Sequence, residues 1–264
     1  MPSTTTGPTT SLAAAVTSPV ASPTSPVASP TSPAAATGSP AASPTGPAAT
    51  PTSPAASPTS PAAAPRTPSV AVAFHSGAGH TARMATAVAD GAASLPGAQA
   101  TLVPVDALDD DAWAALDGAD AIVFGAPTHI GAPSAPFAAF AAATQSRWVE
   151  DRWRDKVAAG FTNSGTIAGD KLNSLQTFAI LAAQHGMVWV GLDLKAGWAT
   201  SDGSPDELNR LGSWLGAMSH SPLDLGPDLA PRDSDLRTAA HLGRRVARIA
   251  RELRLGREAA SAAR

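Results

Sequence analysis

A glycine-rich segment near residue 77 has the composition of a phosphate-binding turn. The segment His75-Ser-Gly-Ala-Gly-His-Thr81 lies between an apolar run and a predicted helix. Its glycines allow a tight turn, Ser76 and Thr81 supply hydroxyl groups, and the unpaired amides of a helix start attract anions. The same hydroxyls could also cap the helix, since the two roles use the same geometry. The segment predicts a phosphate contact from Ser76, Gly77, Ala78, Gly79, His80 and Thr81.

Two other interpretations of this segment stay open. Gly77-x-Gly79-x-x-Ala82 matches a dinucleotide-binding fingerprint, and Asp106 follows at a plausible distance for a ribose contact. A structural turn without any ligand is the second alternative, because glycine-rich turns between strands and helices are common.

Two further segments, 125–133 and 161–169, combine glycine with small hydroxyl and amide groups, and each follows or closes an apolar run. A dinucleotide site does not need a loop like the first of these. A flavin ring does, because it lies between two loops whose backbone amides meet its polar edge. The pair therefore favours a flavin held between residues 126–131 and 163–167, with simple turn formation by Asn163 and Ser164 as the alternative.

The elements that must position these segments alternate along the chain. Apolar runs predict strands and helical periodicity predicts helices. The strands are expected at 70–74, 101–105, 121–124, 157–162 and 187–190, and the helices at 82–95, 109–116, 134–146, 171–184 and 234–255. The alternation indicates an α/β fold, a doubly wound parallel sheet with helices on both faces. Ligands in such folds lie beyond the carboxyl ends of the strands, where the strand order reverses.

One segment outside this alternation could also reach the site. Residues 211–221 resume apolar character after a long excursion. They could complete the fifth strand and bring Trp214 or His220 near the site, with loop packing as the alternative.

The N-terminal part of the chain, residues 1–68, differs from the rest. It holds 16 of the 25 prolines, no charge before Arg66 and a loose heptapeptide repeat over 18–64. Such a Pro/Ala/Ser/Thr-rich segment buries too little apolar surface to fold, so we expect a disordered tail. A spacer or glycosylated stalk, a tolerated repeat expansion and a misassigned start codon are its possible explanations. The folded domain is predicted at 69–256, followed by a flexible C-terminus at 257–264.

The composition excludes several classes of protein. Without cysteine there is no disulfide, no thiolate nucleophile and no Cys-ligated zinc, and the scattered histidines give no metal motif. No apolar run is long enough for a membrane span, and the N-terminus does not resemble a signal peptide. A net charge of −3 argues against nucleic-acid binding. The sequence thus predicts a cytoplasmic protein without a metal.

Four motifs in order resemble those of the WrbA family, the flavodoxin-like NAD(P)H:quinone oxidoreductases. The match covers about residues 69–254, leaving out the tail. It consists of Ser76-x-x-Gly79-His80-Thr81, Pro127-Thr-His-Ile-Gly131, Asn163-Ser-Gly-Thr166 and Gln184-His-Gly-Met187. The resemblance implies a five-stranded flavodoxin-like sheet, FMN as cofactor, NADH or NADPH as cosubstrate, a quinone as substrate and a homodimer or homotetramer.

The resemblance also assigns individual residues. It implies that Trp148 lies over the flavin, with subunit packing as the alternative. The chemistry of its imidazole, rather than the resemblance, makes His129 a candidate proton donor to the quinone, with backbone presentation as the alternative. Three positions depart from the family. The family often has an aromatic residue at the position of Ala78 and an arginine at that of His129. Gln184 aligns with a histidine that the family uses near the flavin. The implied FMN contacts beyond the first segment are Pro127, Thr128, His129, Ile130, Gly131, Asn163, Ser164, Gly165, Thr166, Gln184 and Trp148.

Three functions compete with a quinone oxidoreductase. A flavodoxin-type electron carrier would bind FMN without oxidising NAD(P)H. A Rossmann-like protein would bind NAD without a flavin. An interaction module would have lost the site altogether.

Overall fold

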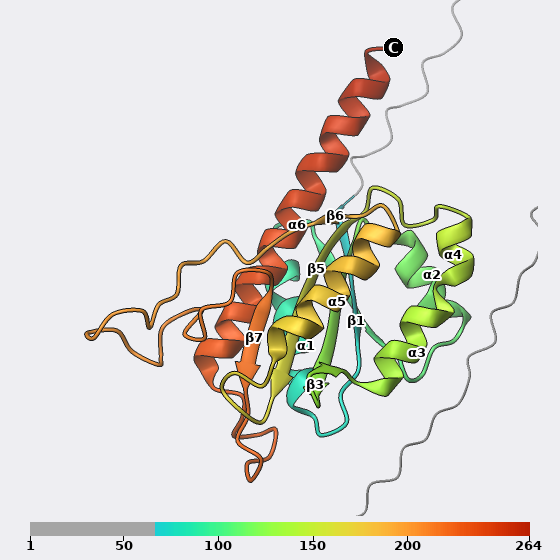
Figure 1. Cartoon of the computed structure of the whole chain (residues 1–264). Coiled ribbons are helices and arrows are strands. Elements are labelled where there is room, and N and C mark those ends of the chain that lie inside the picture. The colour runs from blue at the N-terminus through green and yellow to red at the C-terminus, as the bar shows by residue number, and fades with distance from the viewer. Residues whose placement is uncertain (1–66) are drawn as a thin grey trace, which may run out of the picture. The chain divides into compact units, whose positions relative to one another are not determined.

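A parallel sheet forms the centre of the computed structural model, which describes residues 67–264 (Figure 1). The strand order is β2-β1-β3-β5-β6. This is the order of flavodoxin-like sheets, and it differs from the 3-2-1-4-5-6 order of dinucleotide-binding Rossmann folds. The strands are β1 (Ser69–Phe74), β2 (Gln99–Pro104), β3 (Ala121–His129), β5 (Val157–Ser164) and β6 (Val188–Trp189).

The fifth position of the sheet is filled by two separate segments. β6 pairs with the start of β5, at Val157 and Ala158. The chain then leaves the sheet and returns as β7 (Ala217–His220), which pairs with β5 over Phe161–Ser164. Residues 217–220 therefore complete the fifth strand, which was one of the two alternatives left open for the segment 211–221. The return places the chain beyond β7 at the carboxyl edge of the sheet.

β3 is five residues longer than the sequence predicted, because Gly125–His129 continue the strand where a loop was expected. Residues 125–127 pair with residues 161–163 of β5. Gly125 makes this pairing possible, since a Cβ there would lie 2.1 Å from the Phe161 ring. The chain then turns back as β4 (Ala132–Pro133), which pairs antiparallel with Thr128 and His129. The second predicted loop is thus a hairpin.

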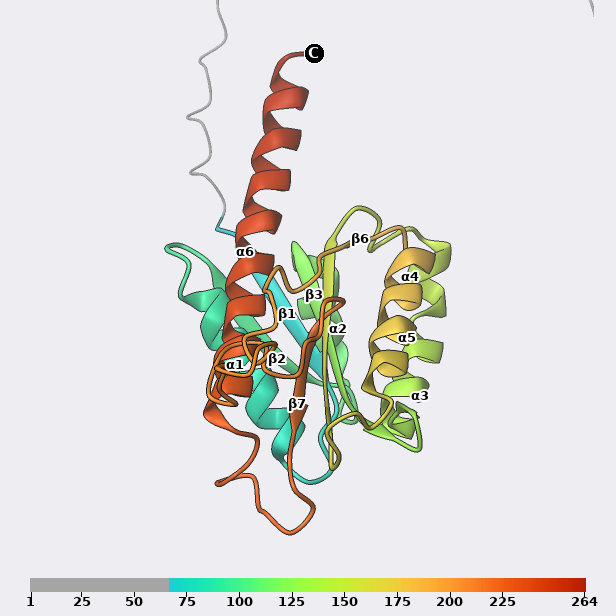
Figure 2. The same ribbon diagram turned by 60° about the vertical axis from the view of Figure 1, so that its left-hand side comes forward.

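Helices cover both faces of the sheet (Figure 2). One face packs against α1 (His80–Ala93) and α6 (Asp233–Ala262). The other packs against α2 (Asp110–Gly118), α3 (Ala135–Ala143) and α5 (Lys171–Gln184), and the short helix α4 (Gln145–Val149) lies next to α3.

The helix boundaries differ most from the predicted ones at two places. The predicted helix 134–146 is divided at Thr144, whose hydroxyl donates to the Ala141 carbonyl. At the other end of the chain, α6 continues through residues 257–262, where the sequence predicted a flexible terminus, and it extends beyond the sheet (Figure 1). No glycine or proline after Gly256 interrupts it.

The predicted tail lies outside the described residues, except for its last two positions. Within residues 67–264, no helix combines the length and apolar character needed to cross a membrane. No group of three or more metal-binding side chains gathers in that same range.

Two glycines allow α1 and α6 to cross closely. A Cβ on Gly243 would lie 1.9 Å from the Val88 carbonyl oxygen, and one on Gly91 would lie 1.9 Å from that of Ala240. Backbone atoms cannot move aside as a flexible side chain would. The contact therefore fixes both residues as glycine.

We expect Gly243→Ala to lower the free energy of unfolding by about 1–3 kcal/mol, because the methyl group overpacks this crossing. Gly256→Ala is the matched control, since it lies in the same helix with nothing within 4 Å of the position that its Cβ would take. It should stabilise the helix by about 0.5–1 kcal/mol. Urea unfolding of both variants checks this, and equal effects would contradict the close crossing.

Candidate functional site

A cavity of about 310 Å³ opens at the carboxyl edge of the sheet, where all three predicted segments meet. Such edges hold ligands in doubly wound folds because several strand ends and helix starts converge there. The cavity is lined by Ser76, Gly77, Ala78, His80, Thr81, Pro127, Thr128, His129, Asn163, Ser164, Gly165, Ser221 and Leu223.

The first segment forms the turn into α1. Gly79 precedes the helix with φ +87°, a left-handed conformation that favours glycine. The Ser76 hydroxyl accepts from the Ala82 amide at 3.0 Å, so it does act as a local cap. The Thr81 side chain is buried at the cavity wall, and its hydroxyl bonds to no described residue. This leaves a donor at a helix start, where an anion is favoured.

The second segment is held in place by a network of hydrogen-bonded hydroxyl groups. Thr128 Oγ1 lies 2.8 Å from Thr162 Oγ1 and 2.7 Å from Ser174 Oγ. The Thr128 side chain thus ties β3 to β5 and α5, and its backbone is the part left for a ligand. His129 follows at the exposed rim of the cavity.

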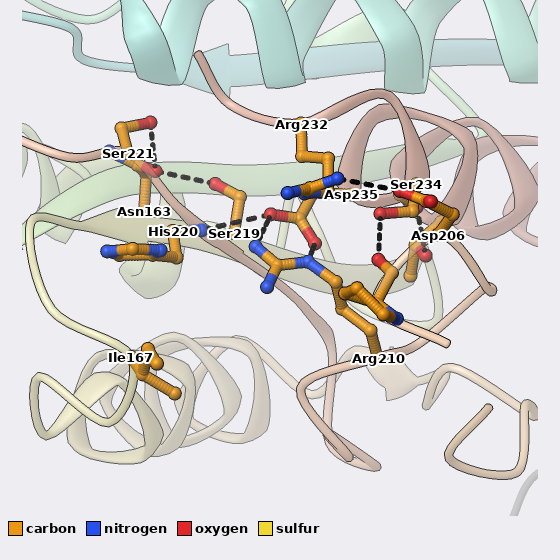
Figure 3. Close-up of polar contacts among 12 residues, drawn as sticks. Asn163, Ile167, Asp206, Arg210, Ser219, His220, Ser221, Arg232, Ser234 and Asp235 are labelled. Atoms are coloured by element: carbon orange, nitrogen blue, oxygen red, sulfur yellow. Dashed lines mark hydrogen bonds and ion pairs between the residues drawn. The ribbon is translucent and has the colours of Figure 1, made fainter. Parts of the chain in front are cut away.

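The third segment is fixed by hydrogen bonds from β7 and from the chain after it. Asn163 Oδ1 accepts from Ser219 Oγ at 2.7 Å and from Ser221 Oγ at 2.9 Å (Figure 3). Ser221 N also donates to the Ser164 carbonyl. These bonds set the orientation of the Asn163 amide at the floor of the cavity.

Residues 221–231, which we call the strap, cross the cavity mouth between the first and third segments. His80 Nε2 lies 2.9 Å from the Leu225 carbonyl, and Arg83 Nη1 donates to the Pro227 carbonyl at 2.6 Å. The Pro227 ring also packs against Gly79, where a Cβ would meet it at 2.9 Å. Leu223 packs in the same way on Gly165. The strap therefore holds both segments in place and adds an apolar wall.

A buried ion pair anchors the strand that leads into the strap. Arg210 donates from Nε and Nη2 to both oxygens of Asp235, at 2.8 and 2.7 Å. Asp235 Oδ2 also accepts from the backbone amide of His220 in β7 (Figure 3). Both charged side chains are nearly inaccessible, with 6 % and 2 % exposure. The pair thus joins the segment between β6 and β7 to β7 itself and to α6.

Burial controls the charge of two groups behind the third segment. It lowers the pKa of His220, with the Lys171 and Arg210 cations adding to the shift. It also lowers the pKa of Lys171 to about 8, against the attraction of Asp235. At neutral pH His220 is therefore neutral and Lys171 remains largely protonated.

Several predicted contacts do not line this cavity. Gly79, Ile130, Gly131 and Thr166 lie in the three segments but outside the lining. Gln184 and Trp148 lie at the opposite, amino edge of the sheet. α5 must run back to that edge before the next parallel strand can begin. There the Gly186 carbonyl accepts a hydrogen bond from the amide of Asp155, which precedes β5. The structure of one chain thus brings neither residue to the cavity.

Sequence reasoning missed Ser221 and Leu223, which line the cavity, and Lys171, which bonds to the cavity residue Ser164. Ser221 and Leu223 reach it only because β7 rejoins the sheet beside β5. The renewed apolar character of 211–221 was the one signal for this, and it pointed to His220 and Trp214. Trp214 is 61 % exposed and lies outside the cavity lining.

Known proteins match this chain over the folded region. The sequence pattern of the NADPH-dependent FMN reductase family matches residues 104–194. Flavodoxin FldP of Pseudomonas aeruginosa is 43% identical over 185 residues, covering 69% of this chain and 96% of that protein. An NAD(P)H dehydrogenase (quinone) of Syntrophobacter fumaroxidans is 32% identical over 215 residues, covering 70% and 98%.

A solved structure agrees with these relatives. The flavodoxin, WrbA-like protein from Agrobacterium tumefaciens is 40% identical, with a TM-score of 0.54, covering 70% of this chain and 99% of that one. The strand order, the three converging segments and these relatives lead to one conclusion. The chain belongs to the WrbA-like family of flavodoxin-like oxidoreductases, enzymes that use FMN with NAD(P)H as the reductant.

Proposed function

We propose that this protein is an FMN-dependent oxidoreductase that passes two electrons from NAD(P)H to a quinone. The observation that carries the proposal is the convergence of three strand-end segments on one cavity, one of them a glycine turn at a helix start. The NAD(P)H dehydrogenase (quinone) relatives support it, because the chain matches almost the whole length of each.

The residues present fit FMN. Ser76, Thr81 and the first amides of α1 would hold the phosphate, since the Thr81 hydroxyl has no described protein partner. The ring would lie between residues 126–131 and 163–167, against backbone groups that the hydroxyl network holds rigid. Leu223 of the strap would shield one side of the ligand from water. Bound FMN would supply the two-electron chemistry, and the protein would orient it and exclude water.

His129 is the proposed proton donor to the quinone. It stands at the rim of the cavity, and its side chain is exposed, so an incoming substrate can reach the ring nitrogens. A purely structural role would leave only the backbone of residues 129–131 in contact with the ligand. We also propose a homodimer or homotetramer, in which Trp148 would lie at a subunit contact.

Steady-state assays test the proposed activity directly. The protein reconstituted with FMN should oxidise NADH or NADPH when benzoquinone is present, with one quinone reduced per nicotinamide consumed. Protein without FMN is the control and should be inactive. FMN binding without quinone-dependent NAD(P)H oxidation would contradict the proposal.

A flavodoxin-type electron carrier is the second candidate function, because the FldP relative bears the name flavodoxin. The same assay separates the two. A carrier would bind FMN and accept electrons from a separate reductase, yet it would turn over NAD(P)H negligibly by itself.

A further inference from the structure

Lys171 is a buried lysine directly behind the third segment. It is the first residue of α5, and its side chain is fully inaccessible. Nζ donates to Ser164 Oγ at 2.9 Å, to the Thr166 carbonyl at 2.8 Å and to the Ile167 carbonyl at 2.8 Å. Ser164 itself lines the cavity. One hydrogen bond therefore separates the ammonium group from the cavity wall.

The hydrogen bonds suit the charged form of this side chain. An ammonium group has three N–H donors and no acceptor, and Lys171 meets three oxygens. The Ser164 hydroxyl donates its own proton to the Thr166 carbonyl, so its oxygen is free to accept from Nζ. A neutral amine would supply one donor fewer. The loop geometry thus selects the protonated lysine.

Within residues 67–264, no carboxylate bonds directly to the Lys171 ammonium group. Its three acceptors are uncharged oxygens. The Asp235 carboxylate accepts from Nε and Nη2 of Arg210, and burial together with the Lys171 and Arg210 cations keeps His220 neutral by lowering its pKa. The charges of Lys171, Arg210 and Asp235 add up to one net positive charge behind the third segment.

We propose that Lys171 is a positioning residue that holds the third segment and supplies a positive charge behind it, so that the protein binds reduced FMN more tightly than oxidised FMN. The inference rests on the proposed function. Two electrons and one proton pass from NAD(P)H, which leaves as NAD(P)⁺, and FMN thereby gains one negative charge. A fixed cation that is buried behind the cavity wall favours that added negative charge.

The test compares dissociation constants for oxidised FMN and for FMN reduced anaerobically, at pH 7 and pH 9. In the full chain, Lys171→Met should lower the preference for reduced FMN about tenfold, which is about 30 mV for a two-electron couple. Lys171→Gln keeps N–H donors without the charge and should show the same loss of preference. Lys195→Met, at an exposed lysine in the segment between β6 and β7, should leave the preference unchanged.

The pH dependence separates charge from structure. Because burial lowers the pKa of Lys171 to about 8, the wild-type preference should fall between pH 7 and pH 9 relative to that of Lys171→Gln. Equal weakening of both FMN states in the Met and Gln variants, or pH profiles parallel to the wild type, would overturn the inference alone. If neither variant folds, a wild-type preference that does not fall toward pH 9 overturns it. Wild-type protein that binds no FMN would overturn the proposed function as well.

Discussion

Replacing Arg210 by methionine should lower the free energy of unfolding by about 3–5 kcal/mol, because it leaves the Asp235 carboxylate buried without its cation. Asp235 is 2 % exposed, and within residues 67–264 the His220 amide alone would remain as its hydrogen-bond partner. At urea concentrations near its unfolding midpoint, the variant should also lose FMN binding, because the same carboxylate anchors β7 and the strap. Urea unfolding at pH 7 measures the effect.

Arg232→Met is the matched control for this prediction. Its partner is Asp206, and both side chains are more than half exposed, so the pair should contribute about 0–1 kcal/mol (Figure 3). The double variant Arg210→Met with Asp235→Leu should recover part of the loss, because no unpaired charge stays buried. Equal losses at Arg210 and Arg232 would show that the pair does not anchor this region.

Thr81→Val should weaken FMN binding about 10- to 100-fold, since a hydrogen bond to a charged group contributes about 1.5–3 kcal/mol. The substitution preserves the shape of the side chain and removes only the hydroxyl. That hydroxyl has no partner within residues 67–264, so the stability of the protein without FMN should change little. Fluorescence titration with FMN gives the dissociation constants.

Riboflavin separates a phosphate contact from a ring contact. It lacks the phosphate, so Thr81→Val should weaken its binding far less than that of FMN. Thr86→Val, on an exposed position of the same helix, is the control and should affect neither ligand. If the Thr81 variant loses riboflavin and FMN equally, the first segment does not bind the phosphate.

Local patterns were sufficient to predict the sheet and most of the residues that line the cavity. The apolar runs around Val72, Val123 and Ala159 are buried strands, and their alternation with helical segments determined a parallel sheet. A parallel sheet places its carboxyl ends at one edge, so segments far apart in sequence were predicted to meet there. The cavity lining confirms that they meet.

The parts that sequence reasoning missed depend on contacts distant in sequence. The extension of β3 through Gly125 requires knowing that Phe161 packs opposite it. The role of Lys171 requires knowing that the third segment folds back over its side chain, since a lysine at a helix start is otherwise interpreted as a solvated residue. Gln184 was placed at the site by resemblance alone, and the return path of α5 carries it to the other edge.

Calorimetric titration of the FMN-free protein with FMN tests the central claim most directly. We expect saturable binding of one FMN per chain, with riboflavin binding much more weakly because the first segment then has no phosphate to hold. Absence of heat and of any shift in flavin absorbance at high concentrations of FMN would contradict the assignment of this cavity to a flavin.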